Sequence, residues 1–86
     1  MDKLTIDELK DILMGITTEP MELVNLTGET LLCQDLGMDE ADMTEMSIEI
    51  GDLLGIHIPT TTWSDWYDNM STLTVQQVID DSNNLL

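Results

Sequence analysis

One stretch in the middle of the chain, positions 35–59, constrains the fold more than any other part of the sequence. It starts with an acidic turn and ends with Gly-Ile-His-Ile-Pro at positions 55–59. Between these ends, apolar residues recur at helical spacing with acidic and polar residues in the gaps: Met43, Met46, Ile50, Leu53 and Leu54. Asp39 is a suitable N-cap and Gly55 a suitable stop. The pattern predicts an amphipathic helix over residues 40–54 that buries those five apolar side chains.

A second helical pattern lies near the N-terminus. Its apolar residues are separated by acidic ones and share one helical face: Leu4, Ile6, Leu9, Ile12, Leu13 and Ile16. Thr5 is a plausible N-cap, and Glu8 completes a capping box three residues later. Gly15 and Pro20 then bracket the end of the helix. These signals predict an amphipathic helix of about three to four turns.

Two shorter helical signals follow position 59. Residues 56–59 are predicted to form an extended connector, and three threonines lead into Trp63, Trp66 and Tyr67, whose spacing suits a short third helix. Residues 71–75 open a last helix, which fades into the polar residues 82–84. Its apolar face is predicted to comprise Leu73, Val75, Val78 and Ile79.

These segments predict a single all-α domain over residues 1–86. Residues 17–34 show no sustained period, so we expect a long ordered loop between the first and second helices. Eighty-six residues suffice for one small core and leave no room for a second domain. Four helices around that core, with a short third helix, account for the whole pattern.

The charge of the chain limits its partners. Eighteen Asp and Glu residues stand against two basic residues, a formal net charge of −16 at pH 7. Such a protein repels nucleic acid phosphates and anionic membranes, so neither is expected as a partner. Basic protein surfaces are the expected partners, and their attraction should weaken as salt is added. We expect the protein itself to be a monomer.

The sequence also indicates a cytoplasmic location. Cys33 is the sole cysteine, so the chain forms no intrachain disulfide and no multi-cysteine metal site. Apolar residues never run to the length of a membrane span, and the first residues lack the pattern of a secretory signal.

Three motifs together resemble the acyl carrier protein family. They are Asp35-Leu36-Gly37-x-Asp39, Gly55-Ile56-x-Ile58-Pro59, and Thr74-Val75-Gln76 followed by Ile79-Asp80. The order of elements is similar to that family from end to end. The resemblance implies an acyl-carrier-protein-like four-helix bundle with a long loop after its first helix.

The resemblance breaks at the residue that matters most to the family. Carrier proteins attach phosphopantetheine to a serine at the start of the second helix, and Glu40 occupies that position here. The leucine that follows this serine in the family is Ala41. A carboxylate cannot form the stable phosphodiester, so no cofactor is expected at Glu40; phosphopantetheine would require Ser there. Thr44 and Ser47 carry hydroxyls, but they lie one and two turns into the helix.

Two readings of Glu40 stay open. The charge is favourably placed at a helix N-terminus, which alone would explain it. Alternatively, the substitution records loss of the carrier site, by natural drift or by deliberate change, and the carboxylate imitates part of the phosphate charge.

The second helix also carries an acidic strip of Asp35, Asp39, Glu40, Asp42, Glu45, Glu49 and Asp52. Such a run can be a solvated face and no more. In the family, the corresponding surface docks against Lys and Arg of partner enzymes. The resemblance therefore implies partner-docking residues Asp39, Ala41, Asp42, Thr44, Glu45, Ile48, Glu49 and Asp52.

No catalytic or metal site is expected. A calcium loop starting at Asp35 fails, because Glu40 replaces the required glycine and Met46 stands where a bidentate glutamate belongs. His57 and Cys33 lack partners at a recognisable spacing, so both are interpreted as structural. The chain shows no nucleophile and base pair, so we expect no enzyme activity.

Three functions remain open from the sequence. The first is an acyl-carrier-like protein that docks with enzymes of fatty acid, polyketide or related acyl assembly and bears no arm. The second is a true acyl carrier protein whose attachment serine is substituted in this chain. The third is an acidic regulatory protein that binds a basic surface unrelated to acyl chemistry.

Overall fold

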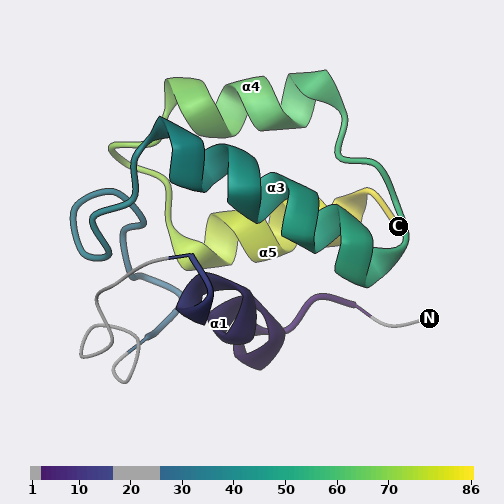
Figure 1. The fold of residues 1–86 in the computed structure, drawn as a ribbon, viewed down its shortest axis with the longest axis horizontal. Helices are drawn as coiled ribbons and strands as arrows, with labels where there is room; N and C mark the ends of the chain where they lie inside the picture. Colours follow the sequence, from purple (N-terminus) through teal and green to yellow (C-terminus); the bar gives the residue numbers. More distant parts are fainter. Residues whose placement is uncertain (1–2, 17–25) are drawn as a thin grey trace.

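The computed structural model describes residues 3–16 and 26–86, which form a small all-helical globule. Its helices are α1 (Ile6–Met14), α3 (Glu40–Leu54), α4 (Thr60–Asp68) and α5 (Val75–Asn84). α3 runs across the middle of the molecule with α4 above it and α1 below it (Figure 1), and α1 also contacts α5. The all-α, four-helix prediction is confirmed for these residues. Part of the predicted loop, residues 17–25, lies outside the described residues.

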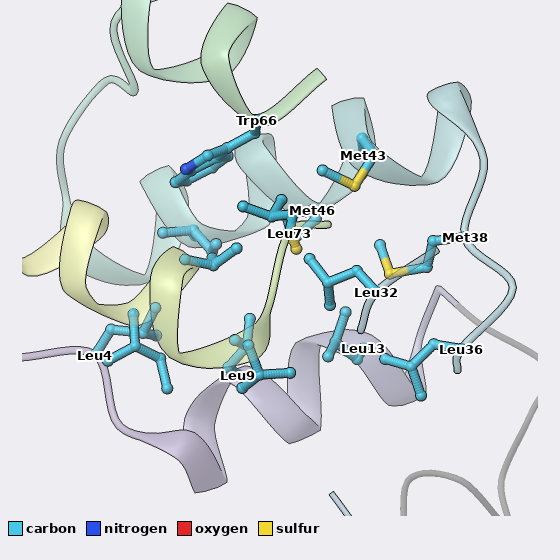
Figure 2. Close-up of a cluster of buried hydrophobic side chains, with 14 of the residues drawn as sticks. Leu4, Leu9, Leu13, Leu32, Leu36, Met38, Met43, Met46, Trp66 and Leu73 are labelled. Atoms are coloured by element: carbon cyan, nitrogen blue, oxygen red, sulfur yellow. The ribbon is translucent and has the colours of Figure 1, made fainter. Parts of the chain in front are cut away.

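The core forms where the four helices meet. Trp66 from α4, Met43 and Met46 from α3, and Leu9 and Leu13 from α1 point toward one another (Figure 2). All five side chains are at most 2% exposed. Each of the four helices therefore buries apolar side chains against the others, which no single helix could do alone.

α1 begins and ends close to the predicted signals. The Thr5 hydroxyl accepts a hydrogen bond from the Glu8 N–H, and the Glu8 carboxylate accepts one from the Thr5 N–H, each at 3.2 Å. Leu4 and Ile16, predicted on this helix, lie just before and just after it. Leu4 nevertheless belongs to the core, and Ile16 packs against it.

α3 has the predicted bounds because both of its ends are set locally. Asp39 caps the first turn, and Gly55 ends the helix in the left-handed region with φ 70°. One predicted core residue is wrong: Leu53 is 48% exposed, whereas Leu54 packs against the core. The two side chains are about 100° apart on the helix, and only Leu54 points to the side that packs against the core.

α4 is longer than predicted. It begins at Thr60, so the three threonines form its first turn rather than a lead-in, and Pro59 is the N-cap. The Trp63 N–H donates to the Pro59 carbonyl oxygen at 3.0 Å. Trp63 and Tyr67 stack with ring centroids 5.4 Å apart, while Trp66 turns into the core.

α5 begins later and ends more firmly than predicted. Leu73 is buried but precedes the helix, and Thr74 is the N-cap. At the other end, the Asn83 side chain accepts a hydrogen bond from the Leu4 N–H at 2.7 Å and donates one to the Leu4 carbonyl at 3.1 Å. Asn83, in the polar last turn of α5, thus ties the C-terminal helix to the segment that precedes α1.

The segment before α3 is held against the start of α5. Backbone hydrogen bonds run from Leu32 to Leu73, from Val75 to Thr30 and from Gln76 to Gly28, at 2.9–3.1 Å. In the described part of the chain, the isolated antiparallel bridge between Leu31 and Thr74 is the sole strand-like pairing. These contacts hold residues 28–32 beside the start of α5.

Candidate functional site

The N-terminus of α3 is built by two aspartates. Asp39 Oδ1 accepts from the Asp42 N–H at 3.0 Å, and Asp42 Oδ2 accepts from the Asp39 N–H at 3.2 Å. This reciprocal capping satisfies two amides and places negative charge at the positive end of the helix dipole. Because of these bonds both aspartates have a structural role in addition to any contact with a partner, although Asp39 is exposed and Asp42 only half-buried.

Asp35 has a separate role in the preceding turn. Its carboxylate accepts a hydrogen bond from the Leu31 N–H at 2.8 Å, and the turn closes at Gly37, whose φ is 67°. The turn inserts Leu36 into the core, where it is 1% exposed. Asp35 therefore belongs to the support of the site and is separated from the acidic strip of the helix.

Glu40 is the first residue of α3, and its carboxylate influences a residue of α4. Hydrogen bonding to the Glu40 carboxylate, followed by desolvation and by the negative charges of Glu40 and Asp68, raises the pKa of the Tyr67 hydroxyl. Tyr67 also stacks on Trp63, so Glu40 acts on one member of an aromatic pair of α4. No local pattern indicates this pairing, because the two residues lie on different helices.

The remaining predicted docking residues form one face of α3. Six residues are exposed and fall within less than half a turn around the helix: Ala41, Thr44, Glu45, Ile48, Glu49 and Asp52. Ile48 is 54% exposed and lies near the centre of this group. We call these six residues the α3 face. It combines three carboxylates with one large apolar side chain.

The two hydroxyls of α3 are both engaged. Thr44 Oγ1 donates to the Glu40 carbonyl oxygen at 3.1 Å, and Ser47 Oγ donates to the Thr44 carbonyl oxygen at 2.7 Å. Ser47 is also buried, with 6% of its surface exposed. Neither hydroxyl occupies the exposed start of the helix that the carrier family uses.

Two hollows flank the α3 face. A groove of about 150 Å³ at its C-terminal end is lined by Ile48, Asp52, Ile56, His57 and neighbouring residues. His57, interpreted from the sequence as structural, is exposed there. At the N-terminal end, a shallow apolar hollow beside Glu40 is lined in part by Cys33, Met38 and Met70. Cys33 is half-buried, with a free thiol.

Neither a metal site nor a membrane span is found in the described residues. No three His, Cys, Asp or Glu side chains within residues 3–16 and 26–86 gather closely enough to hold a metal ion. Over the same ranges, no helix is both long enough and apolar enough to cross a membrane.

No protein-family model, curated protein or solved structure matches the chain.

Proposed function

We propose that this protein is an acyl-carrier-like docking protein. It presents the α3 face to a basic surface on an enzyme of fatty acid, polyketide or related acyl assembly, and it carries no phosphopantetheine at position 40. The observation that carries the proposal is the α3 face itself, in which Glu45, Glu49 and Asp52 surround the exposed Ile48. The motifs that flank this helix are those that resemble the carrier family.

Charge and apolar surface have different tasks on such a face. The chain has two lysines, Lys3 and Lys10, and neither lies on α3, α4 or α5. The carboxylates therefore act together, accelerating encounter with basic partners and selecting among them. Burial of Ile48 against a partner adds about 1 kcal/mol, since roughly half of its surface is available. A partner that fits has Lys or Arg around an apolar contact.

Position 40 does not fit a phosphopantetheine arm. Attachment requires a hydroxyl that can form a phosphodiester, and Glu40 offers a carboxylate that interacts with Tyr67. The hydroxyls of Thr44 and Ser47 donate to backbone carbonyls within the helix. Docking without an arm is the function that these residues support.

Intact-mass spectrometry after incubation with coenzyme A and a phosphopantetheinyl transferase tests the missing arm. The native protein should gain no mass, and Glu40→Ser should gain one phosphopantetheine. Glu40→Ala is the matched control, because it removes the carboxylate without supplying a hydroxyl, and it should stay unmodified. A mass gain in the native protein would contradict the proposal.

A further inference from the structure

A cavity of about 520 Å³ lies between α4 and α5, away from the α3 face. Its volume falls in the range of pockets that bind small molecules. The lining is largely polar and includes Asp65, Trp66, Asn69, Thr72, Gln77 and Asp81. Because no residue of α3 contributes to it, this cavity is separate from the proposed docking face.

Every donor group that lines the cavity makes a hydrogen bond within the protein, and one N–H of each side-chain amide, Asn69 and Gln77, has no second bond among the described residues. The indole N–H of Trp66 donates to Asp81 Oδ2 at 2.9 Å, and Gln77 Nε2 donates to the same oxygen at 3.4 Å. Asn69 Nδ2 donates to the Asp65 backbone carbonyl at 2.9 Å. The Thr72 hydroxyl donates to the Asn69 backbone carbonyl at 3.2 Å. A ligand therefore finds few donors here.

Several side-chain acceptors of the lining, in contrast, receive no hydrogen bond from the described residues. Among the described residues, no hydrogen bond reaches the Asp65 carboxylate, Asp81 Oδ1 or the side-chain carbonyls of Asn69 and Gln77. The two carboxylates come from different helices, Asp65 from α4 and Asp81 from α5. Both lysines of the chain precede α3, so no basic residue of α4 or α5 neutralises them.

We propose that this cavity binds the guanidinium group of an arginine side chain from a partner protein. Arginine offers five N–H donors in a planar fork and accepts none, which complements a cavity that has acceptors and negative charge but few free donors. The alkyl part of arginine can lie against Leu73, the apolar residue of the lining next to Thr72. Anions lack the required donors, and purely apolar ligands leave these acceptors unpaired.

The Trp66 indole N–H provides a direct probe, because it lies in the lining and bonds to Asp81. Its NMR resonance can be assigned with the variant Trp63→Phe, since the chain has two tryptophans. Titration with N-acetyl-arginine amide should shift this resonance to saturation. N-acetyl-citrulline amide has nearly the same shape but no charge, and it should bind at least about ten-fold more weakly.

Two variants of α4 separate a specific site from general attraction. Asp65→Asn should weaken binding of N-acetyl-arginine amide about ten-fold, through loss of one charge-assisted contact. Asp68→Asn removes the same charge from an exposed residue of the same helix outside the lining, and should change the affinity about two-fold or less. Equal effects of the two substitutions, or equal affinities for the arginine and citrulline amides, would overturn the site. Methylguanidinium that binds as tightly as N-acetyl-arginine amide would overturn the assignment to a peptide side chain. The inference stands independently of the acyl-carrier proposal.

Discussion

The hydrogen bonds between Asn83 and Leu4 should contribute a large part of the stability of this small domain. Asn83→Ala removes the acceptor for the Leu4 N–H and the donor to the Leu4 carbonyl, which lie at 2.7 and 3.1 Å. Each such bond contributes about 1 kcal/mol, and Leu4 is 2% exposed, so water replaces them poorly. We expect a loss of about 2–3 kcal/mol in the free energy of unfolding and a fall in Tm of about 10 °C or more.

Urea unfolding followed by far-UV circular dichroism measures this loss, with Asn84→Ala as the matched control. Asn84 is exposed and neighbours Asn83 in α5, so both substitutions share the same gain in helix propensity. The control should change the free energy of unfolding by about 0.5 kcal/mol or less. If the two variants differ by less than that amount, with unchanged denaturant dependence, the reasoning about the N-terminal attachment is wrong.

Three further predictions concern single side chains. Gly51→Ala should destabilise the protein by about 1–3 kcal/mol, because a Cβ at this position would lie 2.8 Å from a backbone carbonyl oxygen. Gly15→Ala is the control and should not destabilise the protein, because its Cβ would lie 3.6 Å from the nearest atom. Thermal unfolding of both variants measures the difference. Ser82→Ala should stabilise by about 1 kcal/mol in urea unfolding, since its buried hydroxyl has no partner in the described residues, and a loss of stability would contradict this. Ultraviolet titration of Tyr67, the sole tyrosine, should give a pKa above the usual value and a lower one in Glu40→Gln. Because the folded-state pKa is raised, the stabilisation by this tyrosine is present below its unfolded pKa of about 10 and is lost as the pH rises through the folded-state pKa. A Tyr67 titration with the usual pKa would count against the contact with Glu40.

The sequence predicted best those features that neighbouring residues determine. Asp39 and Gly55 set the ends of α3 through capping and a positive φ, and both act within a few residues of themselves. Thr5 with Glu8 set the start of α1 in the same local way. The prediction for α4 failed at its start because three β-branched threonines have little helix propensity, and Pro59 before them reads equally well as the end of a connector.

Features that depend on distant residues had no local signal. Asn83 lies 79 positions from Leu4, and nothing around either residue indicates their pairing. The choice between Leu53 and Leu54 depended on where α1 and α4 pack against α3, which periodicity alone does not specify. For the candidate site, the exposed residues of α3 followed from the helical period. The contact of Glu40 with Tyr67, in contrast, required the position of α4.

The proposed docking function is tested most directly by competition for a carrier-binding enzyme. Rising concentrations of this protein should slow the loading of an authentic acyl carrier protein by its phosphopantetheinyl transferase, and the inhibition should weaken with salt. The double variant Ile48→Ser with Glu49→Lys should lose inhibition at least about ten-fold, because it removes the apolar contact and reverses a charge on the α3 face. Asp11→Lys, a charge reversal on the exposed side of α1, should inhibit nearly as well as the native protein. Absence of inhibition by the native protein, or equal losses in both variants, would contradict docking through α3.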